Sequence, residues 1–244
     1  MNKYFMLCVM AASAAQVAAQ TEFGNAAKQG HEGAVNELFN IRYHSINPTR
    51  LAYNRIQTTG EAFVSYDLTR GDFHDAGTAG NVNNINVQLG GLHHFDRVDV
   101  SGYIRYINTS YKNQVWNSTL FLIPKNPFVL ADSVASNGNA ETFAMGAAFA
   151  YRFTKNIKGG LGAGLTVGSM SDQTDPRPKT NTSRFNITAG ADATISSAWV
   201  LGLAARLELL SSNLSYTVVN PLVNHRYFLL KGMGDYYRRS SSED

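Results

Sequence analysis

The chain has 244 residues, with 21 lysines and arginines against 18 aspartates and glutamates, so its formal net charge is only +3. So small a positive charge does not indicate a nucleic-acid-binding protein, and no nucleic-acid partner is expected. The single cysteine, Cys8, lies in a segment that we expect to be removed. Disulfides and cysteine-ligated metals are therefore not expected to hold the fold, and no cofactor is expected.

Residues 1–19 have the pattern of a secretory signal peptide. Lys3 gives a positive start, an apolar run follows from Tyr4 to Ala15, and small residues precede the expected cleavage after Ala19. The apolar run is too short to span a bilayer as a helix, and no run of 18 apolar residues follows it. We therefore expect an exported protein without a transmembrane helix.

The rest of the chain places apolar residues at every second position over long stretches, which is typical of β-strands. In one such stretch, Val98, Val100 and Ile104 alternate with Asp99 and Arg105. On this pattern we expect eight strands, over residues 61–69, 84–92, 98–106, 141–153, 157–169, 184–195, 198–210 and 226–235.

The charged residues favour a membrane-spanning protein over a soluble one. In the first seven strands every charge lies on the face opposite the large apolar residues. A Lys or Arg on the lipid face of a barrel strand costs about 2–4 kcal/mol at the midplane, which explains so clean a face. We predict an all-β fold, an antiparallel transmembrane β-barrel of about eight strands. Its polar lumen would be lined by Asp67, Asp99, Arg105, Arg152, Lys158, Asp192, Arg206 and Glu208. Interfacial aromatic girdles would include Tyr106, Tyr151, Phe153, Phe185 and Trp199.

Connection lengths alternate, as short periplasmic turns and longer outer loops do in such barrels. The alternation holds if 109–140 is one long outer loop, so Trp116, Phe121 and Phe128 are placed outside the membrane-crossing set. The expected organisation is a signal peptide over 1–19, an N-terminal periplasmic or plug segment over 20–60, the barrel over 61–235, and a polar tail over 236–244.

Two local segments suggest structural roles. The glycine-rich strand 157–169 lacks the spacing of a nucleotide-binding loop. We expect its glycines to form a shallow inner groove that accommodates residues 21–47 or large side chains from across the lumen. Residues 174–180 read TDPRPKT. Because proline restricts its own φ and its predecessor's conformation, we expect a stiff, extended bend in an outer loop, with surface recognition by Arg177 as a second hypothesis.

Candidate catalytic or metal-binding residues are few. The adjacent His93 and His94 point to opposite faces if they lie in a strand, and a turn is the expected place for them. His74, with Asp72 and Asp75, forms the best acid/base cluster on the outer side. No serine or second histidine completes a recognisable catalytic pattern there, so the chain is not expected to be an enzyme.

Several segments occur in a characteristic order: NPTRLAY (47–53), GDF (71–73), NPFVLADS (126–133), the glycine-rich strand and DPRPK (175–179). Together, from about residue 35 onward, they resemble an uncharacterised family of Bacteroidota-type outer-membrane β-barrel proteins. The resemblance implies a Gram-negative outer-membrane location, with membrane lipid and the barrel-assembly machinery as partners, and no settled molecular function. The family-motif residues in loops are Asn126, Pro127, Asp132, Asp175, Pro176, Arg177, Pro178 and Lys179.

Members of that family tend to be longer, and this chain ends RRSSSED without the usual terminal aromatic residue. Two alternatives stay open here: a barrel of about eight strands, and a truncated member that holds the first part of a wider barrel. An eight-stranded barrel is just wide enough for side chains, whereas a wider one would leave a polar channel. The expected function is non-catalytic: structural, passive transport or surface contact. The alternatives are an outer-membrane hydrolase with an outer-loop His/Asp site, and a secreted soluble β-sandwich.

Overall fold

The structure is a computed structural model that describes residues 46–53, 58–121 and 128–240. The predicted signal peptide and most of the predicted plug segment lie outside the described residues. The described elements are one short 3-10 helix and ten strands: η1 (Pro48–Tyr53), β1 (Thr59–Arg70), β2 (Asn81–His94), β3 (Val98–Gln114), β4 (Val129–Asp132), β5 (Ser136–Arg152), β6 (Ile157–Asp172), β7 (Pro178–Thr194), β8 (Val200–Tyr216), β9 (Arg226–Gly232) and β10 (Asp235–Ser240). In these ranges no helix is both long and apolar enough to cross a membrane.

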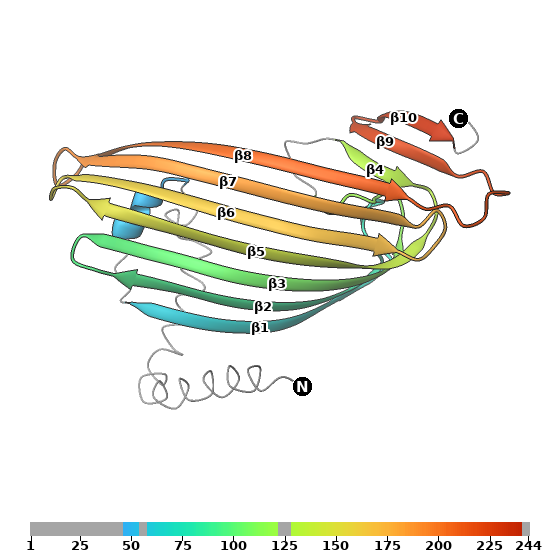
Figure 1. Ribbon diagram of the computed structural model, residues 1–244, viewed down its shortest axis with the longest axis horizontal. Helices are drawn as coiled ribbons and strands as arrows, with labels where there is room; N and C mark the ends of the chain where they lie inside the picture. Colours follow the sequence, from blue (N-terminus) through green and yellow to red (C-terminus); the bar gives the residue numbers. More distant parts are fainter. Residues whose placement is uncertain (1–45, 54–57, 122–127, 241–244) are drawn as a thin grey trace. The chain divides into compact units, whose positions relative to one another are not determined.

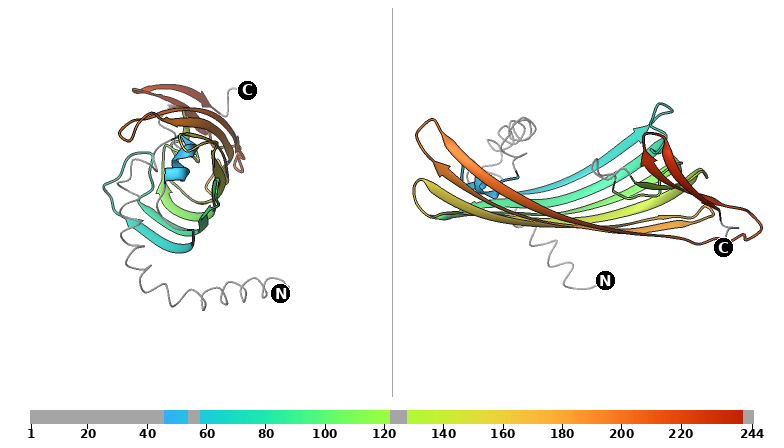
Figure 2. Two further views of the ribbon diagram at one scale, coloured as in Figure 1. Left: turned by 90° about the vertical axis from the view of Figure 1, so that its left-hand side faces the viewer. Right: turned by 90° about the horizontal axis from the view of Figure 1, so that it is seen from above.

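Seven of the strands form one sheet in the order β1-β2-β3-β5-β6-β7-β8, and every neighbouring pair is antiparallel (Figure 1). The sheet curves into a trough, and η1 lies on its concave side (Figure 2). The three remaining strands form a second antiparallel sheet in the order β10-β9-β4. The prediction of an all-β, antiparallel fold is confirmed.

The first seven predicted strands are confirmed, but most of them continue further at the end of the sheet that carries the long connections, such as those between β1 and β2 and between β6 and β7. There the sheet is extended by polar pairs such as Asn139 with Ser171 and Asn181 with Asn213. Backbone pairing needs no apolar side chains, so the ladder continues where the period-two signal stops. Phe185, expected near a strand end, consequently lies in the middle of β7.

The eighth predicted crossing is wrong. Residues 226–232 do form a strand, but β9 pairs with β4 and β10 and not with β8. Alternation identifies a strand without identifying its partner, and the partner here comes from within the long loop predicted over 109–140. That loop is shorter than expected, because β3 runs to Gln114 and β5 starts at Ser136. Trp116, Phe121 and Phe128 do lie outside the seven-stranded sheet. Most of the predicted tail forms β10.

The two faces of the seven-stranded sheet differ in which residues they bury and expose. The buried positions on the concave side include Asp99 and Asp192, which are 0% and 2% exposed. On the convex side the large apolar residues stay exposed, with Leu203 at 79%. One lateral row of this face crosses all seven strands and consists of Ala62, Leu89, Ile104, Met145, Leu165, Phe185 and Leu209.

A small hydrophobic cluster covers the concave side at the end of the sheet that carries the long connections. Tyr111, Ala140 and Met170 are buried there, with Leu120 packed against them. The segment that carries Leu120 is also held by a hydrogen bond, since Thr180 Oγ1 donates to the Ser118 carbonyl oxygen at 2.6 Å. The described part of the β3–β5 connection therefore folds onto the polar face of the sheet.

Close packing of η1 predicts different costs for two adjacent glycines of β6. A Cβ on Gly160 would lie 2.9 Å from the backbone nitrogen of Thr49, whereas a Cβ on Gly159 would meet only the movable ring of Phe153. Gly160→Ala should lower the free energy of unfolding by about 1–3 kcal/mol through overpacking. Gly159→Ala is the matched control and should cost less. Urea unfolding followed by tryptophan fluorescence measures both, and equal losses would contradict the packing of η1.

Candidate functional site

The concave face carries the polar residues predicted to line a lumen. The strand register places all eight on this face: Asp67, Asp99, Arg105, Arg152, Lys158, Asp192, Arg206 and Glu208. Seven of them fall into three groups along the trough, and Asp67 lies apart from these near the end of β1. One group surrounds η1, a second lies at the turn between β2 and β3, and the third lies in the middle of the sheet.

A buried carboxylate on β7 holds the segment that leads into η1. Asp192 Oδ1 accepts a hydrogen bond from Asn47 Nδ2 at 2.6 Å. Its other oxygen accepts one from Thr49 Oγ1 at 2.6 Å. Asn47 Oδ1 in turn accepts a hydrogen bond from the Thr49 backbone N–H at 3.1 Å. We call these three residues the η1 seat. Hydrogen bonds to a charged group typically contribute about 1.5–3 kcal/mol each, so the seat fixes η1 firmly.

Two glycines leave the space that the side chains of the η1 seat occupy. A Cβ on Gly190 would collide with the Asn47 side chain, and one on Gly202 would collide with Asp192. The predicted glycine groove is thus occupied close to its expected place, over Gly160 on β6 and Gly190 on the neighbouring strand β7. Asn47 belongs to the N-terminal segment that was expected there, while residues 21–45 lie outside the described residues.

Lys158 contacts the far end of η1. Its Nζ lies 3.3 Å from the centroid of the Tyr53 ring, in the geometry of a cation–π contact. The adjacent strand places Asp192 directly opposite Lys158. Opposite charges on neighbouring strands therefore hold the two ends of the same short helix.

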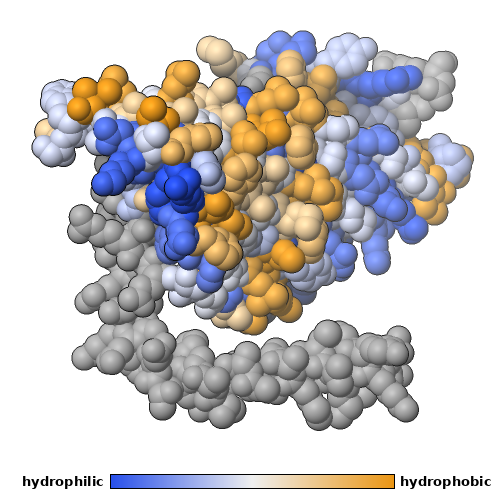
Figure 3. Space-filling view, turned by 60° about the vertical axis from the view of Figure 1, so that its left-hand side comes forward, coloured by the Kyte–Doolittle hydropathy of each residue, from blue (hydrophilic) through white to orange (hydrophobic). Residues whose placement is uncertain are grey.

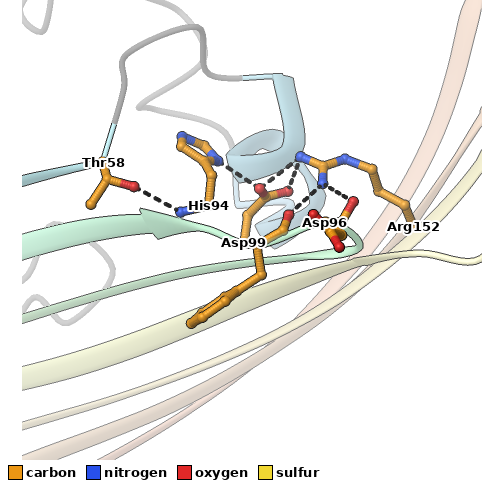
Figure 4. Close-up of polar contacts among 6 residues, drawn as sticks. Thr58, His94, Asp96, Asp99 and Arg152 are labelled. Atoms are coloured by element: carbon orange, nitrogen blue, oxygen red, sulfur yellow. Dashed lines mark hydrogen bonds and ion pairs between the residues drawn. The ribbon is translucent and has the colours of Figure 1, made fainter.

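The second group is built around Asp99, whose side chain is fully buried (Figure 4). Its carboxylate lies 2.6 Å from His94 Nδ1 and accepts a hydrogen bond from Arg152 Nη2 at 2.6 Å. Arg152 Nη1 also donates to the carbonyl oxygens of Phe95 and Asp96, at 3.4 and 3.3 Å. One carboxylate and one guanidinium therefore join β2, β3, β5 and the turn before β3.

His94 lies at the end of β2 and not in a turn, so the predicted placement is wrong. The expectation of opposite faces for the two histidines holds. His94 contacts Asp99 on the concave side, while His93 packs edge-on against Phe95 with ring centroids 4.3 Å apart. Alternation along β2 separates the two imidazoles.

The third group pairs charges of both signs near the middle of the sheet. Arg184 Nε lies 2.7 Å from Glu208 Oε1, and Arg206 Nη2 lies 3.2 Å from Glu208 Oε2. Arg105 Nε donates to Asn86 Oδ1 at 2.9 Å. These mixed pairs line the polar face without a large field of one sign.

In the TDPRPKT segment between β6 and β7, Asp175 binds the connection between β8 and β9. Its carboxylate accepts hydrogen bonds from the backbone N–H groups of Val219 and Asn220, at 3.0 and 2.9 Å. These two bonds lower the pKa of the Asp175 carboxyl. The segment is a tight turn and not an extended bend, since Arg177 has a φ of 38° and its N–H donates to the Thr174 carbonyl oxygen. The predicted extended conformation at Arg177 is therefore wrong.

The prolines of this turn occupy distinct places. Pro176 follows a cis peptide bond and is fully buried. Pro178 is the first residue of β7, a position at which a strand tolerates proline. Arg177 and Lys179 are exposed. The motif thus ends one connection and, through Asp175, orders the next one between β8 and β9.

The NPFVLADS motif also contributes a buried acid. Asp132 is the last residue of β4, and its Oδ1 accepts a hydrogen bond from the Val134 N–H at 2.8 Å. Burial raises the pKa of the Asp132 carboxyl, and it likewise raises the pKa of the Tyr111 and Tyr216 hydroxyls. Asn126 and Pro127 of the same motif lie outside the described residues.

The predicted acid/base cluster is only partly assembled. His74 Nδ1 lies 3.0 Å from the backbone carbonyl oxygen of Asp75, in an exposed loop. The short imidazole–carboxylate contact described above belongs to His94 and Asp99, at the opposite end of the strands. Within the described ranges, no three His, Cys, Asp or Glu side chains converge as a metal site requires.

The convex face presents a continuous apolar band (Figure 3). Hydrophobic side chains gather over its middle, with hydrophilic ones to either side. Within the band a shallow groove of about 580 Å³ crosses β3, β5 and β6. Small residues form its floor, at Gly102, Ala147 and Ala163, and larger ones such as Met145 and Leu165 form its wall.

A protein-family comparison matches residues 48–244 to the group described as Family of unknown function (DUF6850). The chain belongs to this family. The match begins at Pro48, the first residue of η1, so the DUF6850 region contains both sheets and most of the η1 seat. Comparisons with curated proteins and with solved structures returned no match. The expected membership of an uncharacterised family is confirmed at this level.

Three functional residues were not predicted, although the sequence contains a signal for each of them. Asn47 and Thr49 belong to NPTRLAY, which marked the family without indicating a contact. Arg184 is the first residue of the predicted strand 184–195 and shares the parity of Asp192, so the alternation already places it on the charged face, where it pairs with Glu208.

Loss of the η1 seat should release η1. We expect Asp192→Ala to lower the free energy of unfolding by about 2–4 kcal/mol, because it removes two charge-assisted hydrogen bonds from a buried site. Trypsin should then cleave faster after Arg50. Asp67→Ala removes an exposed carboxylate of the same face and is the matched control. Cleavage at the wild-type rate in Asp192→Ala would contradict the role of the seat.

Acidification should loosen the β8–β9 connection. A carboxyl whose pKa is lowered on folding contributes stability above its unfolded pKa of about 4, and that stability disappears as the pH falls through the lower folded pKa. Amide protection factors at Val219 and Asn220 should therefore fall on acidification below about pH 4. In Asp175→Asn they should be lower at neutral pH and insensitive to acid. Acid-insensitive protection in the wild type would contradict this role for Asp175.

Proposed function

We propose that the chain is an integral β-barrel protein of a Gram-negative outer membrane, of the Bacteroidota type that the sequence motifs resemble. Its convex face contacts lipid and its concave face lines the lumen. It is exported by its signal peptide and inserted by the barrel-assembly machinery. The observation that carries this proposal is the lateral apolar row from Ala62 to Leu209, which is exposed on six of the seven strands and half-buried at Leu165, while the charges lie on the other face.

The dimensions of the apolar band support the proposal. On β5 the band runs over the nine residues from Phe143 to Tyr151. A tilted β-strand needs about 9–11 residues to cross a bilayer. Tyr151 and Phe153 pack edge-on at one margin, and Trp199 is 70% exposed at the same end. Such aromatics suit the interface between lipid and water.

The exposed band also argues against a soluble protein. Soluble monomers rarely expose one continuous apolar patch larger than about 300–600 Å². A soluble sandwich would need a second sheet over this face. In the described chain the strands β4, β9 and β10 form a separate small sheet and pair only with one another. Contact with lipid stabilises Leu89, Ile104 and Met145 at their exposed positions on the convex face.

The role proposed for this barrel is non-catalytic. Its polar face is occupied by η1 at one end and by residues 115–121 at the other. Fixed side-chain pairs such as Arg184–Glu208 fill part of the space between them. These contacts favour a structural or surface-contact role, with only restricted passive transport through the lumen.

Membrane fractionation tests the location. We expect the protein in the outer-membrane fraction, with faster migration on a denaturing gel before heating than after it. Recovery from the soluble periplasmic or secreted fraction would contradict the proposal and revive the β-sandwich alternative.

A charge-placement experiment tests the lipid-facing assignment directly. Phe185 and Asn181 lie on the same face of β7, inside and outside the apolar band. In a membrane, Phe185→Arg should lower stability by about 2–4 kcal/mol, because the charge enters hydrocarbon near the midplane. Asn181→Arg should have little effect. Equal effects on the unfolding free energy in lipid vesicles would show that the band does not face hydrocarbon.

A further inference from the structure

The two margins of the seven-stranded sheet are open. Along their outer edges, β1 and β8 pair with no strand of the described chain (Figure 1). β1 has 12 residues and β8 has 17, so both edges extend across the apolar band. Open sheet edges do not occur in the hydrocarbon of a membrane, because their N–H and C=O groups have no water to bind. If the proposed function holds, something pairs with both edges.

Side chains at the two margins point to the same conclusion. One lateral row of the concave face runs from Phe63 on β1 to Leu210 on β8. Its inner strands contribute polar or small residues, including Gln88, Arg105 and Arg184, whereas both ends are large and apolar. Phe63 is 50% exposed and Leu210 is 37% exposed. In this row, large apolar residues therefore lie only on the two strands that would adjoin a missing neighbour.

Strand direction restricts what that neighbour is. Six successive antiparallel pairings reverse the chain six times, so β8 runs in the same direction as β1. Direct closure of β8 on β1 would make a parallel seam. A second copy inserted in the same orientation would make two such seams. Membrane barrels of this kind are antiparallel throughout, and only an odd number of intervening strands satisfies both edges.

Resting on the proposed function, we propose that an odd number of additional membrane-crossing β-strands joins β8 to β1, antiparallel to both. They belong to a polypeptide segment that is not among residues 46–240. Their chemistry is set by the two edges. They alternate apolar and polar residues, continue the convex apolar band, and bring apolar side chains to Phe63 and Leu210 on the lumen side.

Photocrosslinking in the native membrane tests this inference. A benzophenone amino acid replaces Phe63 in one variant and Leu210 in another. Phe149, 42% exposed on the convex face of the central strand β5, is the control position. Heat-modifiable migration checks that each variant is folded. Illumination should shift the band of both edge variants but not that of the Phe149 variant, and peptide mass analysis should assign each adduct to a segment outside residues 46–240.

Other outcomes would overturn the inference. An adduct that joins β1 to β8 would show closure on itself or on a second copy, and a mixed-isotope sample separates these two. Folded, membrane-embedded variants without edge adducts would show that the margins are not covered by strands. Fractionation of the same samples keeps the two proposals apart, because a protein absent from the membrane fails the proposed function first.

Discussion

The structure depends on an antiparallel register that continues unbroken through the apolar band. Side chains alternate along each strand, so a slip of one residue at any pairing would exchange the two faces of every strand beyond it. The six pairings keep Leu89, Ile104 and Met145 in one row and Gln88, Arg105 and Ala144 in the next. The register irregularity between β3 and β5 occurs only beyond Tyr111, outside the band. An apolar convex face and a charged concave face follow from this one constraint.

A polar interior must then satisfy its own groups, because buried polar groups are costly without partners. The concave face does this at three levels. Asp192 accepts hydrogen bonds from residues that lie more than 140 positions earlier in the chain. Asp99 contacts His94 and Arg152 from two neighbouring strands. At the end that carries the long connections, a folded connection covers the concave face and contributes Leu120. Together these contacts order the concave face of the curved sheet.

The strands and their faces were predictable because alternation is local. Seven of the strands, and the side on which Asp99 or Arg206 lies, follow from residues a few positions apart. Long-range pairing was not predictable in this way. RYFLLKG has the same pattern whether β9 joins the large sheet or pairs with β4. The η1 seat joins Asn47 to Asp192 across most of the chain, and the carboxylate of Asp175 binds a connection more than 40 residues later. Motif residues marked these places without revealing their partners.

The central claim is that one face of the sheet meets lipid and the other meets a polar interior. A nitroxide scan along β5, from Thr142 to Arg152, tests it most directly. Collision with oxygen, which concentrates in hydrocarbon, should be high at Phe143, Met145, Ala147 and Phe149. Collision with a water-soluble nickel chelate should be low at those positions, and the ratio of the two should alternate with a period of two residues. High nickel accessibility at the convex positions, in protein reconstituted into vesicles, would contradict the account.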